Sequence, residues 1–177
     1  KRQKGAQCVE CHMPEKTYMG IDDRRDHSIR IPRPDLSVKH GSPNACNLCH
    51  TDQDAQWAAD AVDRFKGPDR PKEVRHPEAF HAFRTGKPEA EKLLLATCRD
   101  SESPAFTRAG AMLALRRFLS DASFDEARRN LDSNESVVRT AAVSKLEDLP
   151  PERSHASLVR MLGDPILAVR SEAARIL

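Results

Sequence analysis

Two short cysteine motifs constrain this chain more than any other feature. The first, CVECH, spans residues 8–12, and the second, CNLCH, spans residues 46–50. Cys-x-x-Cys-His is typical of c-type haem attachment, in which two thiols bond covalently to the porphyrin and the histidine coordinates the iron. Positions i, i+3 and i+4 lie on one face of a helical turn, so both sulfurs and the imidazole can meet one flat ring. Two such motifs predict two covalently bound haems c.

The site residues of this prediction are six. Four thiols would hold the porphyrins and two histidines would be the proximal iron ligands: Cys8, Cys11, His12, Cys46, Cys49 and His50. A redox dithiol can also use Cys-x-x-Cys, and two such pairs with thirty-four residues between them can bind zinc through four thiolates. Neither alternative explains why each pair is followed directly by a histidine.

Composition supports a bound macrocycle in the first half of the chain. Of the first fifty residues only twelve are apolar once the motif cysteines are set aside, and they follow neither a helical nor a strand period. Side chains alone cannot build a core there. Two haems would supply the missing apolar surface, with short loops and turns around them.

Charge and hydropathy exclude other classes. Charged residues make up 32% of the 177 residues, but the net charge is only +2, so no basic field indicates nucleic acid. The sequence contains no run of eighteen apolar residues, the length needed to span a membrane. Its basic start is not followed by an apolar segment, so it does not have the pattern of a signal peptide. Since haem c is attached outside the cytoplasm, we expect a periplasmic or otherwise extracytoplasmic protein, of which this chain is a processed or trimmed piece.

The haem motifs and their surroundings resemble a known family. The strings CHMP (11–14), RDHSIRIP (25–32) and NACNLCHT (44–51) are similar to the last two haem motifs of pentahaem cytochrome c nitrite reductases. They are closer still to bacterial multihaem cytochromes that continue into helical repeats. The resemblance covers roughly residues 8–66. The reductases' catalytic haem, with lysine in place of the motif histidine, has no counterpart, so nitrite reduction is not implied.

The second iron ligands are less determined. The resemblance implies that His27 binds an earlier haem and that the Cys8/Cys11 haem takes its distal ligand from a downstream helix. His76 and His81 compete for that role, with His76 favoured because a loop position would give it more freedom. His40 lies six residues before Cys46, so it can fold over the second haem or remain a loop residue. Met19 is a weaker candidate, because compact multihaem modules usually use two imidazoles.

A 31-residue period runs through the second half. Arginine recurs at 108, 139 and 170, alanine at 111, 142 and 173, and leucine at 115, 146 and 177. Helix pairs separated by polar turns at this period are typical of an α-solenoid, and the pattern resembles HEAT repeats. The apolar helix at the C-terminal end has no polar cap, so we expect the repeats to continue in the native protein.

Several single residues have plain structural interpretations. Helix is expected from about residue 45, carrying the second motif on its first turns, and again through 53–65, where Trp57 should pack on a haem edge or on the helix beneath it. Cys98 should be a buried, inert thiol, and His155 should lie on a solvated face. Four arginines could pair with haem propionates or simply be exposed charges: Arg24, Arg25, Arg30 and Arg33.

The predicted fold class is all-α, with a loop-rich dihaem cytochrome c module followed by an α-solenoid of HEAT-like helix pairs. We expect the module at 1–67, a connecting segment with possible distal ligands at 68–86, and the repeats at 87–177. Two bis-histidine haems imply electron transfer, with a redox protein or other haem domains docking on the repeats. The alternatives are an oxidoreductase acting on a small nitrogen oxide or peroxide at an open iron, and a haem-bearing binding scaffold.

Overall fold

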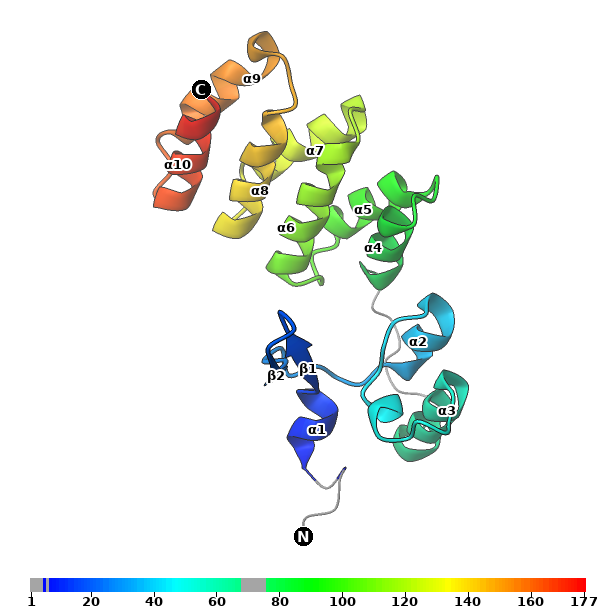
Figure 1. The fold of residues 1–177 in the computed structure, drawn as a ribbon. Helices are drawn as coiled ribbons and strands as arrows, with labels where there is room; N and C mark the ends of the chain where they lie inside the picture. Colours follow the sequence, from blue (N-terminus) through cyan, green and yellow to red (C-terminus); the bar gives the residue numbers. More distant parts are fainter. Residues whose placement is uncertain (1–4, 6, 68–75) are drawn as a thin grey trace. The chain divides into compact units, whose positions relative to one another are not determined.

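The computed structural model describes residues 5, 7–67 and 76–177, and the chain divides into two compact units, Lys1–Glu73 and Val74–Leu177. Figure 1 shows short elements in the first unit and a series of helices in the second. The boundary falls inside the segment expected to connect the domains. Residues 68–75 of that segment lie outside the described residues, and the rest of it begins the second unit.

The first unit is built from short elements. They are α1 (Cys8–His12), β1 (Glu15–Tyr18), β2 (Asp22–Arg25), α2 (Pro34–His40), the 3₁₀ helix η1 (Cys46–Leu48) and α3 (Ala55–Lys66). β1 and β2 pair antiparallel, with Tyr18 opposite Asp22. Helix α2 packs against α3. The predicted helix through 53–65 is confirmed by α3, whose Asp54 caps the N-terminus and whose Gly67, at φ 83°, ends it.

Three details of this unit differ from the expectation of short loops and turns followed by helix from about residue 45. The β1–β2 hairpin occupies part of the expected loop, with Gly20 at φ 74° in its tight connection. Helix α2 begins at Pro34, because proline is compatible with the first turn of a helix, where its missing N–H is not needed. The second motif forms only the 3₁₀ turn η1, and His50 lies beyond it.

The second unit is entirely helical over its described residues, and the all-α fold class is confirmed. Its elements are α4 (His76–Arg84), α5 (Ala90–Arg99), α6 (Ala105–Ala114), the 3₁₀ helix η2 (Leu115–Arg117), α7 (Asp121–Asn130), α8 (Ser136–Leu146), α9 (Pro151–Met161) and α10 (Leu167–Ile176). Helices α6, α8 and α10 lie side by side, while α7 packs on α8 and α9 on α10 (Figure 1).

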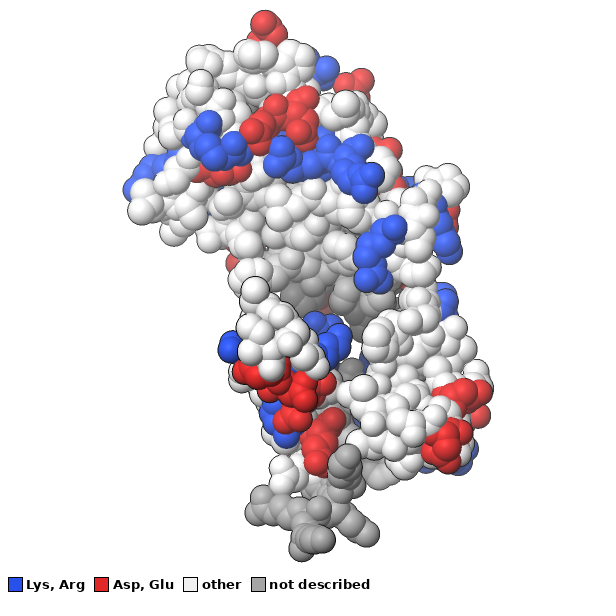
Figure 2. All heavy atoms as spheres, viewed as in Figure 1, with Lys and Arg blue, Asp and Glu red and all other residues white. Residues whose placement is uncertain are grey.

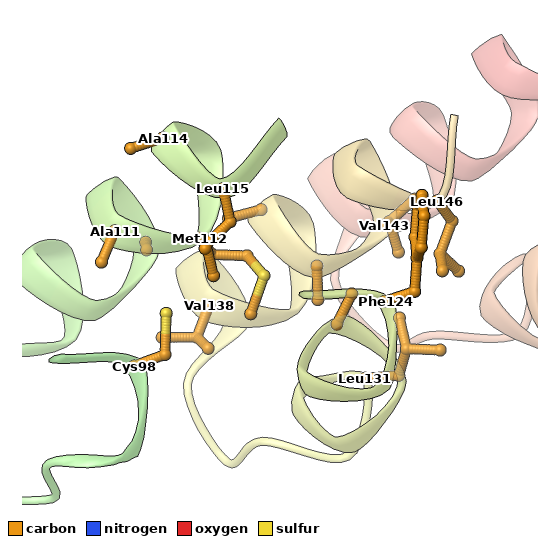
Figure 3. Close-up of a cluster of buried hydrophobic side chains, with 14 of the residues drawn as sticks. Cys98, Ala111, Met112, Ala114, Leu115, Phe124, Leu131, Val138, Val143 and Leu146 are labelled. Atoms are coloured by element: carbon orange, nitrogen blue, oxygen red, sulfur yellow. The ribbon is translucent and has the colours of Figure 1, made fainter. Parts of the chain in front are cut away.

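The hydrophobic core lies in this second unit. Figure 3 shows Met112, Leu115, Val138, Phe124 and other side chains of α6, α7 and α8 meeting between the helices. The alanines of the 31-residue period are fully buried, and so are its first two leucines, so helices can approach closely at these positions. Leu177, the third leucine, is half exposed.

Charged side chains link neighbouring helices of this unit, and Figure 2 shows basic and acidic groups side by side on its surface. Glu147 accepts hydrogen bonds from Arg116 at 2.9 Å and from Arg175 at 2.8 and 2.9 Å. These guanidinium groups, Arg175 first, lower the pKa of Glu147 to about 2. Arg139 binds the carboxylate of Asp164 through Nε at 2.7 Å and Nη2 at 3.0 Å, and both side chains are nearly buried.

A fully buried lysine was not foreseen from the sequence. Lys145 of α8 donates to the carbonyl of Phe118 at 2.8 Å and lies 4.1 Å from the ring centroid of Phe124. Burial lowers the pKa of its ammonium group, and the carboxylate of Asp148 opposes that shift. The side chain therefore joins the α6–α7 connection to α8 through a polar contact inside an apolar core.

Candidate haem-attachment sites

The first motif forms the helical turn that its spacing predicts. Cys8, Cys11 and His12 all lie within α1, with both thiols free and exposed. Residues i, i+3 and i+4 of a helix share one face, so the three groups can address a single ligand. Exposure also leaves both sulfurs accessible for a covalent bond.

His12 is held at two points by one residue of the chain. Its Nδ1 lies 2.7 Å from the backbone carbonyl of Arg30, and the backbone N–H of Arg30 donates to the carbonyl of His12 at 2.9 Å. A carbonyl oxygen only accepts, so Nδ1 must carry the proton. Nε2 is then the unprotonated nitrogen, with its lone pair available to a metal.

The hairpin fixes the C-terminal end of α1. Arg25, at the end of β2, donates from Nη1 to the carbonyls of Val9 and Met13 at 3.4 and 3.3 Å. Its Nη2 pairs with Glu15 of β1 at 2.9 Å. A cation is favourable at a helix C-terminus, where carbonyls lack partners within the helix. The unexpected hairpin thus orders the turn that carries the first motif.

A network of amide side chains orders the second motif. Asn44 accepts from the N–H of Asn47 at 3.1 Å and donates to its Oδ1 at 2.7 Å, and it also donates to Ser37 of α2 at 3.1 Å. Asn47 in turn donates to the carbonyl of Gln53 at 2.8 Å. These contacts join η1 to α2 on one side and to the start of α3 on the other.

His50 contacts an aromatic side chain. Its imidazole lies 4.7 Å from the ring of Trp57, centroid to centroid, with the planes tilted by 48°. Trp57 is half-buried in the first turn of α3, where its backbone N–H donates to the Asp54 carboxylate at 2.7 Å. Within the described residues, the His50 ring has no hydrogen bond like that between His12 and Arg30. The two motif histidines are therefore oriented by different means.

The two motifs lie near each other within the first unit. Burial raises the pKa of the Cys46 thiol, and the neighbouring thiols of Cys11 and Cys49 raise it further. Cys11 belongs to the other motif, so its influence shows that the motifs are close. Across the residues that the structure describes, however, no three histidine, cysteine or acidic side chains gather as metal ligands, so the zinc alternative finds no four-thiolate cluster.

The exposed apolar side chains of the first unit fit a large apolar ligand. The core cluster of the described residues belongs wholly to the second unit, and Ala58 and Ala59 are the buried hydrophobic residues of the first. Large apolar side chains of the first unit are exposed instead: Tyr18, Met19, Ile21, Ile29, Ile31, Val38, Leu48 and Phe65. The free thiols, the available Nε2 of His12 and this uncovered surface together fit covalently attached haem.

The candidate distal ligands are distributed over both units. His27 is exposed in the turn after β2, where Asp26 accepts from the Ser28 N–H at 2.9 Å. His40 ends α2 and is half-buried, with its Nε2 shielded from solvent. Met19 is exposed in the hairpin turn. Which of them binds an iron stays a prediction.

His76 and His81 both lie on α4 and belong to the second unit, whereas both motifs belong to the first. The expected loop position of His76 is wrong, because it is the first residue of that helix. The reason for preferring it over His81 therefore disappears, and both are half-buried.

The remaining single-residue expectations have mixed outcomes. Cys98 is buried, as expected, and its thiol pKa is raised to about 12, first by desolvation. His155 is exposed on α9, as expected. Each of the four arginines considered for propionates forms an ion pair with a carboxylate of this chain, the pairs being Arg24–Asp22, Arg25–Glu15, Arg30–Asp26 and Arg33–Asp35.

Comparison with known proteins agrees with the motif geometry. A family model described as cytochrome c552 matches residues 1–101, which is more than half of the chain. The chain belongs to the cytochrome c552 family. Its members are c-type cytochromes related to nitrite reductase, so covalently bound haem c and a haem-based redox function follow. No curated protein and no solved structure matches the chain significantly.

Two further facts constrain this cytochrome c552 family member. Proteins with haem c are typically extracytoplasmic. Among the described residues no helix is long and apolar enough to cross a membrane. The contacts of Arg30 and Asn47 were not predicted from the sequence. Arg30 accepts through its backbone carbonyl, which every residue has, so its identity gives no signal. Asn47 occupies a variable position of the Cys-x-x-Cys motif, where no role is expected of a side chain.

Proposed function

We propose that the chain carries two haems c, attached through Cys8 and Cys11 and through Cys46 and Cys49, and transfers electrons between them. His12 and His50 are the proximal ligands. The observation that carries the proposal is the His12–Arg30 contact, which leaves Nε2 free on the face that also presents two unbonded thiols. Bound haem supplies an iron that gains and loses one electron.

Bis-histidine ligation is the second part of the proposal. The chain offers His27 and His40 in the first unit and His76 and His81 on α4 as distal ligands. Two imidazoles per iron would close both faces to substrate and favour a low potential. The proximity of Cys11 to Cys46 supports rapid exchange between the two haems, because their attachment points are neighbours.

The helical unit is proposed to be a HEAT-like solenoid that docks a redox protein or another haem domain. Support comes from the 31-residue period, the row of α6, α8 and α10, and exposed apolar side chains on α6 and α10 such as Phe106 and Leu167. The corresponding domains are the dihaem module at 1–67, the segment 68–86 and the repeats at 87–177.

Intact mass and the visible spectrum test the proposal. The protein isolated from a host that attaches haem c should exceed the chain mass by two haems and show low-spin, six-coordinate iron that added cyanide or nitrite does not perturb. A chain mass without haem would overturn the proposal. A high-spin band that nitrite or cyanide shifts would overturn the electron-carrier function and favour an oxidoreductase with an open iron.

A further inference from the structure

We infer that Trp57 is a positioning residue that sets the orientation of the imidazole plane of His50. Through that orientation it would influence the g values and the midpoint potential of the second haem. The inference rests on the proposed function, because it requires His50 to be the proximal ligand of an attached haem. It assigns a role to a side chain that a packing interpretation would treat only as core.

The geometry of the two rings supports a direct role. A centroid separation of 4.7 Å is contact distance, and a tilt of 48° places the rings neither parallel nor perpendicular. Rotation of the imidazole would therefore drive its edge toward or away from the indole. The backbone of Trp57 is held at the start of α3, because its backbone N–H donates to the Asp54 carboxylate at 2.7 Å, so the indole projects from a fixed point.

The segment between the two residues is closed. Asn47 donates to the carbonyls of Gln53 at 2.8 Å, Asp54 at 3.3 Å and His50 at 3.4 Å. The N–H of Gln53 also donates to the carbonyl of His50 at 3.2 Å. One amide side chain thus binds both ends of the loop, so His50 and Trp57 keep their spacing while the indole constrains the ring.

The other motif histidine has a different constraint. His12 is oriented by its Nδ1–H bond to Arg30, whereas the described residues provide no such hydrogen bond for the His50 ring. A histidine that binds a metal is normally oriented by a hydrogen bond from its other ring nitrogen. At His50 the ring contact with Trp57 would do this instead. Loss of the indole should therefore change one haem and leave the other as it was.

Electron paramagnetic resonance of the oxidised protein measures this effect, because the g values of a low-spin ferric haem depend on how the axial imidazole planes are oriented. Trp57→Leu should shift the g values of one of two haem signals and the midpoint potential of the same haem. Trp57→Phe keeps an aromatic ring and should give a smaller shift. Gln56→Leu is the control, since Gln56 is the exposed neighbour of Trp57 on the same helix and its side chain donates to Asp60 at 2.8 Å, and it should shift neither signal.

Intact mass and far-ultraviolet circular dichroism establish that each variant is loaded and folded. Unchanged g values in a fully loaded, folded Trp57→Leu protein would overturn the inference and leave the proposed function standing. An equal shift in Gln56→Leu would also overturn the inference. If Trp57→Leu fails to fold, Trp57→Phe becomes the test. Identical g values in Trp57→Phe and the parent protein would then overturn the positioning role of Trp57. A parent protein without haem would overturn both proposals.

Discussion

Replacing Ser133 with aspartate should stabilise the helical unit, because it would supply a partner for a buried guanidinium nitrogen. Arg108, Arg139 and Arg170 occupy equivalent positions of the 31-residue period. The Nε of Arg139 is bound by Asp164, twenty-five residues later, whereas the buried Nε of Arg108 finds no hydrogen-bond partner among the described residues. The residue twenty-five positions after Arg108 is Ser133.

The two acceptor positions have the same local geometry. Asp164 Oδ1 accepts from the N–H two residues later at 2.8 Å, and Ser133 Oγ accepts from the N–H two residues later at 3.3 Å. Aspartate at 133 can keep this turn contact and present its second oxygen to Arg108. A buried unsatisfied donor costs about 1–3 kcal/mol, and desolvation of the new carboxylate offsets part of the gain.

We therefore expect a net gain of about 1 kcal/mol for Ser133→Asp, which raises the Tm of a unit of this size by about 4–8 °C. Thermal unfolding followed by circular dichroism measures it. Ser133→Asn is the control, since it retains the turn contact without the charge. A double-mutant cycle with Arg108→Met isolates the pair. An equal gain in the Arg108→Met background, or no gain at all, would refute the reasoning.

Two further predictions concern the same unit. Asp164→Asn should destabilise it by about 3 kcal/mol, because it breaks a nearly buried ion pair with Arg139. The pKa of Asp164 is held below its ordinary 3.8, chiefly by the hydrogen bond from Arg139, so its stabilisation is complete above that pH and is lost as the pH falls toward the lower, folded-state pKa. Urea unfolding at pH 7 and pH 3 should show a larger loss of stability in the parent than in the variant. Cys98, with a pKa of about 12, should resist a thiol-specific reagent at pH 8 until the protein unfolds, and rapid labelling of the folded protein would contradict its burial.

Residue spacing predicted the parts of the structure that depend on local geometry. The first motif is a helical turn because its own five residues form one, and α3 follows the recurrence of Trp57, Ala58 and Ala61. The alanines that recur with the 31-residue period are all fully buried, so the period marks positions that face the core.

The missed features depend on long-range or backbone contacts. Both hairpin strands are largely exposed and charged, so no alternation of apolar residues indicated them. Proline usually interrupts regular structure, yet Pro34 starts helix α2. Lys145 is buried because Phe124 and the carbonyl of Phe118 surround it, and neither is near it in sequence.

The uneven placement of the core has a consequence for how the protein matures. The core cluster of the described residues serves the second unit, which can fold by burying its own side chains. The first unit leaves its motif thiols accessible and its larger apolar side chains uncovered. This distribution predicts an order of events in which the helices are complete before the cofactor arrives. The enzyme that attaches haem would then act on a unit without a core of its own, joined in sequence to one that is already folded, and covalent attachment would be the last folding step.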